Sequence, residues 1–253
     1  MKAIKDMSII VTGGGSGIGE ATARYFAERG AMVTICGRRA DRIMSVAATI
    51  GEHCVGIAAD VTDAEDRSSL IEAALAHGGG IDVLINNAAN MYRAPVESLE
   101  QDRLADVFST NVIGPMMLTG LCVPHLEARK GVVLFVGSAH TKRAFPGASP
   151  YAATKAAVET LTAVLAAELG PRGIRVSAIR PGAVYTEINQ RAGLFDDDTA
   201  LERLQSLGSA HVLGRIGTPT EIAEGLAYLA CAEWTTGAVL VVDGGLGLGV
   251  TNA

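Results

Sequence analysis

The stretch TGGGSGIG at residues 12–19 decides the fold of this chain. An apolar, β-branched run at 8–12 leads into it, and a helical pattern at 18–29 follows it. Glycines at such a point allow a sharp turn and let the backbone approach a pyrophosphate closely. The N-terminus of the following helix offers unpaired N–H groups and the positive end of its dipole. Strand, glycine-rich turn and helix together predict a dinucleotide-binding unit rather than a plain turn.

The rest of the chain repeats this alternation of strand and helix. The strands are continuously apolar, which is typical of strands buried on both faces of a parallel sheet. We therefore expect an α/β fold, a doubly wound parallel sheet flanked by helices, in a single domain of residues 1–253. The alternation of strand and helix is interrupted at about 187–217, which predicts an insertion that covers the substrate at the carboxyl ends of the strands. Strands are expected at 8–12, 32–36, 54–59, 81–86, 132–136, 174–179 and 239–242, and helices at 18–29, 39–50, 64–76, 101–125, 150–169 and 220–231.

Composition narrows the class of protein. With 253 residues, 49% hydrophobic and 19% charged, the chain is long and apolar enough to bury a substantial core. Its net charge of −6 argues against nucleic acid as the main partner. The four cysteines are widely spaced and are expected to be buried thiols, and the five histidines show no metal-ligand spacing, so no metal is expected. We see no signal peptide and no apolar run long enough for a membrane span, which predicts a cytoplasmic protein without a membrane partner.

The end of the second expected strand bears on the choice of nucleotide. An acidic residue there would bind the 2′-hydroxyl of NAD, but the sequence has Gly37, which clears space, and then Arg38. Because a guanidinium suits a 2′-phosphate, we favour NADP(H) over NAD(H). Arg39 either assists or simply starts the next helix. Asp60, after the third strand, is expected to accept a hydrogen bond from adenine or else to cap the following helix, a role that Asp63 could also fill.

The chemical residues are expected at the other end of the site. In YAATK, residues 151–155, Tyr151 and Lys155 lie four residues apart and so share one helix face. The ammonium is expected to lower the pKa of the phenol and to make it a proton-transfer group. Ser138 closes the fifth strand, where its hydroxyl would hold the substrate oxygen. Asn111 is unfavourable in mid-helix, which suggests a hydrogen-bonding duty such as holding a water near Lys155.

Together these residues resemble the short-chain dehydrogenase/reductase family, and in particular carbonyl reductases of the 3-oxoacyl-ACP reductase type. The resemblance rests on TGGGSGIG, Asp60, the NNAA of residues 86–89, Asn111, Ser138, YAATK and the Pro181-Gly182 pair, and it extends over essentially the whole chain. It implies a single Rossmann domain with a seven-stranded parallel sheet, and a homotetramer. Two departures are noted: Ala89 replaces a usual glycine, and Ser16 stands where NADP-type members often carry a basic residue.

The resemblance also implies roles for individual residues. Tyr151 would be the general acid/base, and Lys155 would hold the nicotinamide ribose and tune Tyr151. Ser138 would orient the substrate, and Asn111 would anchor a proton-relay water. The expected cofactor-binding residues are Gly13, Ser16, Gly17, Ile18, Gly19, Arg38, Arg39, Asp60, Val61, Asn87, Ala88, Tyr151, Lys155, Pro181, Gly182, Val184 and Thr186.

The sequence thus predicts an oxidoreductase that transfers a hydride between NADP(H) and a small carbonyl or alcohol substrate. An NAD-dependent alcohol or sugar dehydrogenase is the alternative. A third hypothesis is a nucleotide-binding protein without turnover. It is disfavoured by the presence of the complete catalytic set Tyr151, Lys155, Ser138 and Asn111. His140, Phe145 and Tyr185 are expected to line the substrate pocket, with Arg143 as a further candidate.

Overall fold

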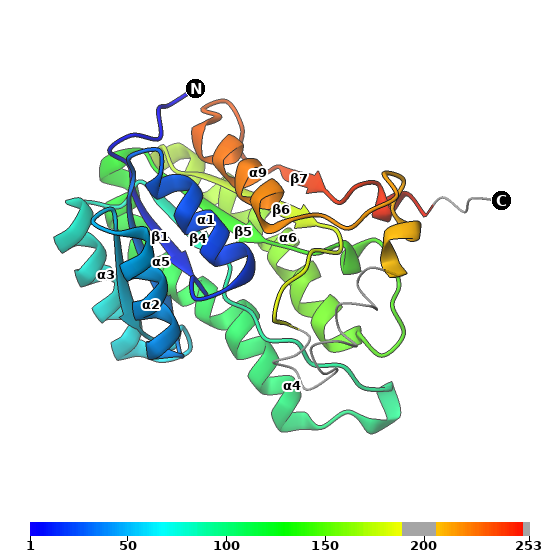
Figure 1. Cartoon of the computed structure of the whole chain (residues 1–253). Coiled ribbons are helices and arrows are strands. Elements are labelled where there is room, and N and C mark those ends of the chain that lie inside the picture. Colours follow the sequence, from blue (N-terminus) through cyan, green and yellow to red (C-terminus); the bar gives the residue numbers. More distant parts are fainter. Residues whose placement is uncertain (189–205, 250–253) are drawn as a thin grey trace.

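The computed structural model describes residues 1–188 and 206–249. In this part of the chain, seven strands form one sheet in the order β3-β2-β1-β4-β5-β6-β7. Every neighbouring pair is parallel, which confirms the predicted doubly wound α/β fold (Figure 1). The strands are β1 Ser8–Thr12, β2 Met32–Gly37, β3 Cys54–Ala58, β4 Val83–Asn86, β5 Val132–Val136, β6 Arg175–Pro181 and β7 Val239–Val242.

Helices cover both faces of the sheet. Helices α1, α2 and α9 pack on one face, and α3, α5 and α6 pack on the other. Strand β1 shows why its sequence is apolar throughout: Ile9 and Val11 belong to the first core and Ile10 to the second, because successive side chains of a strand point to opposite faces. The main helices are α1 Gly17–Ala27, α2 Ala40–Ile50, α3 Ala64–Gly78, α4 Gln101–Phe108, α5 Gly114–Arg129, α6 Ser149–Leu169 and α9 Pro219–Cys231.

The order of the strands places a crevice above β1. The chain builds β2 and β3 on one side of β1 and then returns to build β4 on the other side. Connections therefore leave the carboxyl ends of β1 and β4 in opposite directions, and ligands of such sheets bind at this switch point. The glycine-rich turn follows β1 directly and opens at this crevice.

The long helix expected at 101–125 differs from the prediction. A π-helical turn, Ser109–Ile113, separates α4 from α5, and the helical run continues through Pro124 as far as Arg129. Single π turns inside α-helices often occur at functional sites. Asn111, the residue that seemed misplaced in a helix, lies within this turn.

The same helical run bears on the membrane expectation. By length and composition, Gln101–Arg129 could cross a bilayer, so the sequence does contain one such segment among the described residues. This is weak evidence, because the core helix of a globular protein meets the same criterion. Leu118, Cys122 and Leu126 of α5 are in fact buried against the sheet. All four cysteines are buried free thiols, as expected.

Candidate active site

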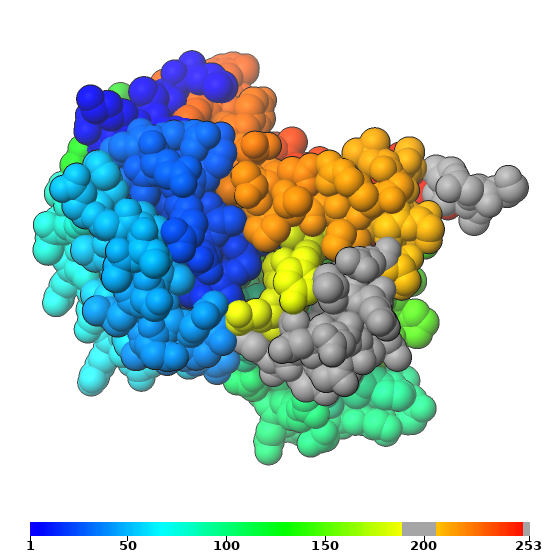
Figure 2. All heavy atoms as spheres, viewed as in Figure 1, coloured from blue at the N-terminus to red at the C-terminus, as the bar shows by residue number. Residues whose placement is uncertain are grey.

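One cavity of about 430 Å³ opens along the carboxyl ends of the strands. Its lining runs from Gly13 and Gly17 of the glycine-rich turn to Ser138, Tyr151 and Lys155. Figure 2 shows the chain that follows β6, in yellow, between the blue N-terminal region and the orange region of α9. The nucleotide motif and the chemical residues, which lie more than a hundred residues apart in sequence, therefore share one cavity.

The glycine-rich turn has the geometry that a pyrophosphate requires. Gly13 and Gly17 adopt φ of +68° and +57°, where other residues are strained. A Cβ on Gly19 would collide with the Gly13 carbonyl, so the third glycine permits close packing of α1 on the turn. Ser16 is the N-cap of α1 but makes no side-chain cap hydrogen bond. The first N–H groups of α1 therefore remain available to an anion, which fits a dinucleotide.

Thr12 fixes the two sides of the crevice to each other. Its Oγ1 accepts hydrogen bonds from the backbone N–H groups of Asn87 at 3.0 Å and Ala88 at 2.9 Å. The Asn87 side-chain amide also donates to the Thr12 carbonyl at 2.8 Å. These contacts join the end of β1 to the segment after β4. The role of Thr12 was not predicted, although it stands first in the quoted motif.

The two arginines after β2 have different surroundings. Arg38 lines the cavity, and its guanidinium donates to Asn90 Oδ1 at 3.1 Å. Arg39 forms an ion pair with Glu187 at 2.7 Å and donates to Ser16 Oγ at 3.4 Å, and it is not among the lining residues. Of the two, Arg38 is therefore the one placed to meet a nucleotide.

Asp60 and Asp63 have separate tasks. Asp63 is the N-cap of α3 and accepts from the backbone N–H groups of Glu65 and Asp66. Asp60 lines the cavity, and one of its carboxylate oxygens accepts from Thr62. The helix cap is thus supplied by Asp63, which leaves Asp60 facing the nucleotide site.

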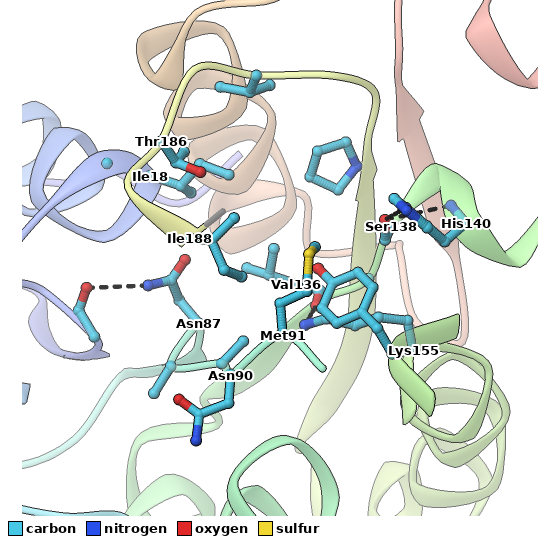
Figure 3. Close-up of a pocket in the computed structure, with 18 of the residues that line it drawn as sticks. Ile18, Asn87, Asn90, Met91, Val136, Ser138, His140, Lys155, Thr186 and Ile188 are labelled. Atoms are coloured by element: carbon cyan, nitrogen blue, oxygen red, sulfur yellow. Dashed lines mark hydrogen bonds between the residues drawn. The ribbon is translucent and has the colours of Figure 1, made fainter. Parts of the chain in front are cut away.

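The phenol and the amine lie one turn apart at the start of α6, and both are buried. The Lys155 ammonium donates to the Val136 carbonyl at 2.8 Å and lies 5.5 Å from the centre of the Tyr151 ring (Figure 3). Burial raises the pKa of Tyr151 to about 12, opposed by a hydrogen bond with Ser138. Burial also lowers the pKa of Lys155 to about 8, opposed by the charge of Glu159. The pKa of Tyr151 is therefore above its ordinary value, opposite to the lowered pKa that was expected, because loss of hydration dominates.

Ser138 stands beside this pair. Its Oγ lies 3.0 Å from Nδ1 of His140, and the two side chains are joined in Figure 3. The His140 ring stacks on Phe145 with centroids 4.4 Å apart and meets Tyr151 edge-on at 5.2 Å. Both His140 and Phe145 line the cavity, so His140 is not simply an exposed loop residue.

Two other residues considered for the substrate pocket lie elsewhere. Tyr185 is 42% exposed and is not among the residues lining the cavity. Arg143 donates to the carbonyls of Ala210 and Leu246 and thereby connects the loop after β5 to the C-terminal segment. Neither position follows from sequence distance to Ser138, because loop side chains are directed by tertiary contacts. The described residues Met91 and Arg93, which were not predicted, line the cavity, and so does Leu207 of the 187–217 stretch.

Asn111 connects the π turn to α6. Its amide N–H groups donate to the Asn90 carbonyl at 2.9 Å and to Thr154 Oγ1 at 3.0 Å, and its Oδ1 accepts from the Asn90 N–H at 2.8 Å. Thr154 in turn donates to the Tyr151 carbonyl. Both amide protons are therefore engaged, and a water near Lys155 would have to be held by an oxygen of Asn111 rather than by its N–H groups.

A buried ion pair beneath the site was missed by the sequence analysis. Glu159 accepts two hydrogen bonds from Arg180 of β6, at 2.9 and 2.7 Å, and one from Thr141 at 3.0 Å. Both charged side chains are nearly covered. The signal was available in part, because Glu159 follows Lys155 by four residues and so shares its helix face. The partner Arg180 could not be inferred without the sheet.

A cradle for a dinucleotide and a buried tyrosine, lysine and serine in one cavity define a nicotinamide-dependent oxidoreductase. A family model described as enoyl-(acyl carrier protein) reductase matches residues 13–247. Glucose 1-dehydrogenase of Gluconobacter oxydans is 35% identical, over 95% of this chain and 91% of that protein. L-fucose dehydrogenase of Bos taurus is 36% identical, over 95% of this chain and 89% of that protein.

The solved structures agree. The crystal structure of a 3-ketoacyl-(acyl-carrier-protein) reductase from Brucella melitensis, complexed with NADH, superposes with a TM-score of 0.88 at 32% identity, over 96% of this chain and 99% of that one. This chain belongs to the short-chain dehydrogenase/reductase family. It is an NAD(P)-dependent oxidoreductase acting on CH–OH or C=O groups, which confirms the predicted class of enzyme.

Proposed function

We propose that this protein is an NADP(H)-linked reductase of small carbonyl compounds. The observation that carries the proposal is that Ser138, Tyr151 and Lys155 line the same cavity as the glycine-rich turn. A substrate between the phenol and a bound nicotinamide would meet the hydroxyl groups of both Tyr151 and Ser138. Positioning and stabilisation of charge in such a buried site supply most of the rate of this class of reaction.

In the reductive direction, a bound reduced nicotinamide supplies a hydride to the carbonyl carbon. Tyr151 donates its proton to the oxygen on which negative charge develops, and Ser138 donates a hydrogen bond to the same oxygen. A phenol with a pKa of about 12 is fully protonated at neutral pH, which suits the role of proton donor. Lys155, with a pKa of about 8, is mostly cationic at pH 7 and would hold the nicotinamide ribose. Asn111 would anchor the water that resupplies the proton.

The remaining contacts with the cofactor are proposed for residues that line the same cavity. The backbone at Gly13, Ser16, Gly17 and Ile18 would take the pyrophosphate, with Gly19 permitting the close packing behind it. The other proposed contacts are Asp60 and Val61 with adenine, Asn87 and Ala88 with a ribose, and Pro181, Gly182, Val184 and Thr186 with the nicotinamide, and all of these residues line the cavity.

The preference for NADP(H) rests on the end of β2. Because residue 37 is a glycine, no carboxylate is present there to bind the 2′-hydroxyl of NAD or to repel the 2′-phosphate of NADP. Arg38, the next residue, lines the cavity. A guanidinium there favours a 2′-phosphate. Arg39 is held by Glu187, so we assign it at most a supporting role.

A second candidate is an NAD(H)-linked alcohol or sugar dehydrogenase. It is supported by Ser16, which supplies no positive charge in the glycine-rich turn, and by Asn90, which already accepts a hydrogen bond from Arg38. Two of the relatives are named for the oxidation of sugars. The two candidates differ in cofactor and in physiological direction, and they share the same catalytic residues.

The pocket and the surface suggest further features. We propose that His140 and Phe145 contact the substrate. The 187–217 stretch of this single catalytic domain would cover the substrate: residues 189–205 of the stretch lie outside the described residues, and its described residues Ile188 and Leu207 line the cavity. We also propose a cytoplasmic homotetramer. Its interfaces would cover the large apolar side chains that the π turn, α5 and the segment before β7 expose, namely Ile113, Met116, Met117, Leu121 and Trp234.

Titration of the purified protein with NADPH and with NADH, followed by cofactor fluorescence, tests the nucleotide proposal. Turnover is then measured with ethyl acetoacetate in the reductive direction and with D-glucose and L-fucose in the oxidative direction. Tighter binding of NADPH and reduction of the oxo ester are expected. Tighter binding of NADH with oxidation of a sugar would select the second candidate, and tight binding without turnover of any of these compounds would contradict both.

A further inference from the structure

The Ser138 hydroxyl has more neighbours than its role as a substrate-orienting group requires. The backbone N–H of His140 donates to Oγ at 3.3 Å, and this contact caps the short helical turn Ala139–Thr141. The Nδ1 atom of His140 lies 3.0 Å from the same oxygen. Tyr151 meets the His140 ring edge-on, and all three residues line the cavity. Figure 3 shows the serine and the imidazole side by side at the wall of the cavity.

Counting donors and acceptors restricts the direction of these bonds. A hydroxyl has one proton and two lone pairs, and the backbone N–H of His140 occupies one lone pair. Two arrangements remain for the imidazole. Either Nδ1–H donates to Oγ and the serine proton points towards the phenol and the cavity, or the serine proton is directed to an unprotonated Nδ1 and only a lone pair faces the cavity.

The two arrangements differ in their effect on the reaction. An oxygen that gains negative charge is stabilised by a donor and is repelled by a lone pair. A phenolate on Tyr151 would likewise be stabilised by donation from the serine and not by a lone pair. The first arrangement alone lets Ser138 serve the proposed chemistry.

We propose that His140 is a positioning residue that keeps its Nδ1–H tautomer, donates to Ser138 Oγ and thereby directs the Ser138 proton at the reacting oxygen. The catalytic consequence rests on the proposed function, whereas the tautomer is a property of the folded chain by itself. This effect of His140 on the reaction passes through Ser138 and is additional to the substrate contact proposed above for the same ring.

The surroundings of His140 keep the ring neutral and in place. Its pKa is lowered to about 4 by burial and by the positive charges of Arg93 and Lys155, so at neutral pH the ring carries a single N–H whose position matters. Phe145 stacks on one side of the ring, and Tyr151 meets it at 85°. These aromatic contacts restrict rotation of the ring, which keeps Nδ1 turned towards Ser138.

Another histidine of this protein, His211, provides a reference for the Nδ1–H tautomer. Nδ1 of His211 lies 2.7 Å from the Leu207 carbonyl, which can only accept, and Nε2 of His211 accepts from the Ala183 N–H at 3.2 Å. His211 must therefore be the Nδ1–H tautomer when neutral. Its signals mark the pattern expected for His140.

The test is a long-range ¹H–¹⁵N correlation spectrum of the full chain labelled with ¹⁵N-histidine, recorded at pH 7. The five histidines give separate ring patterns, and the pattern absent from His140→Asn identifies His140. We expect a protonated Nδ1 and an unprotonated Nε2, as in His211, and reversion towards Nε2–H in Ser138→Ala. A His140 ring protonated on Nε2 in the native chain, or a pattern unchanged in Ser138→Ala, would overturn the proposal.

Kinetics separate positioning from simple packing. His140→Leu removes the donor and should lower kcat roughly tenfold, the scale of one hydrogen bond to a developing charge, with the cofactor Kd little changed. His140→Asn places an amide N–H where Nδ1 was, because both atoms are bonded to Cγ, and should recover most of kcat. The substrate is whichever of ethyl acetoacetate, D-glucose and L-fucose the native enzyme turns over fastest.

Equal loss in the asparagine and leucine variants, or a loss confined to KM, would contradict the positioning role. Circular dichroism and thermal unfolding of both variants establish that they fold. If the native enzyme turns over none of the three compounds, the proposed function fails, and the tautomer of His140 is still decided by the spectrum.

Discussion

The two ends of the cavity are built in different ways. The nucleotide end consists mainly of backbone: a glycine-rich turn with two positive φ angles and the open N-terminus of α1. The chemical end consists of side chains that come from the segment after β5, from the π turn and from α6, and all are buried. The first end is a local property of about eight consecutive residues. The second exists only when three distant segments pack together.

Burial also separates the electrostatics of the two ends. Arg38 and Arg39 are solvent-exposed, so their charges are screened and each contributes modestly. Tyr151 and Lys155 lie out of water, where burial raises the pKa of Tyr151 and lowers the pKa of Lys155. Substitutions at the chemical end should therefore alter turnover, and substitutions at the nucleotide end should alter affinity.

Tyr151→Phe is expected to show this separation most strongly. Loss of the phenolic proton removes general acid catalysis and should lower kcat by ~10² or more. Binding of the cofactor, measured by fluorescence titration, should remain near the native value, because the ring and its packing are retained. Near-native turnover in this variant would remove Tyr151 from the mechanism.

Arg38→Leu tests the nucleotide end. Loss of a charge-assisted contact to a 2′-phosphate should weaken NADPH binding by roughly 10- to 100-fold and leave NADH binding nearly unchanged. Arg39→Leu is the matched control, since Arg39 is paired with Glu187 and should have a much smaller effect. Equal responses of NADPH and NADH to the Arg38 substitution would show that Arg38 does not select the cofactor.

Thr12→Val tests the contact between the two sides of the crevice. The substitution conserves shape but leaves the N–H groups of Asn87 and Ala88 without their acceptor, which should lower the free energy of unfolding by about 1–3 kcal/mol. Urea denaturation measures this change. The exposed Thr49→Val should change stability by less than about 0.5 kcal/mol, and a similar loss in both variants would argue against a special role for Thr12.

Glu159→Gln is expected to have the smallest effect, confined to the pH profile. The Glu159 carboxylate raises the pKa of Lys155 against the effect of burial, which leaves it at about 8. Reductive kcat/KM should therefore fall as the pH rises through about 8 and Lys155 loses its charge, and in Glu159→Gln this fall should begin at lower pH. At pH 8 the loss should be less than about tenfold.

The control for this prediction lies on the same helix. Glu168→Gln alters an exposed carboxylate of α6 at its far end and should leave the pH profile as it is in the native enzyme. A profile that does not move in Glu159→Gln, or that moves to higher pH, would show that Glu159 does not support the charge of Lys155.

Sequence patterns predicted most of the fold and the nucleotide end. The strand, turn and helix from Ser8 to Ala27 follow from apolar runs and from glycine conformations, which act over a few residues. The shared face of Tyr151 and Lys155 follows from helical spacing, and both residues line the predicted cavity. The sequence also showed that Asn111, a polar residue of low helix propensity, lies within an expected helix, and this placement indicated a hydrogen-bonding role.

Other features depended on contacts between distant segments. Asn111 of the π turn bonds to Asn90 and to Thr154 of α6, and the pKa of Tyr151 rises because packing removes its hydration. Likewise, the pairing of Glu159 with Arg180 requires β6 to lie beside α6. The strand–helix alternation and the glycine-rich turn depend on residues that are neighbours along the chain, so the sequence by itself determined them. Hydration, charge pairing and side-chain direction depend on residues that are neighbours in space, so only the tertiary structure decided these properties.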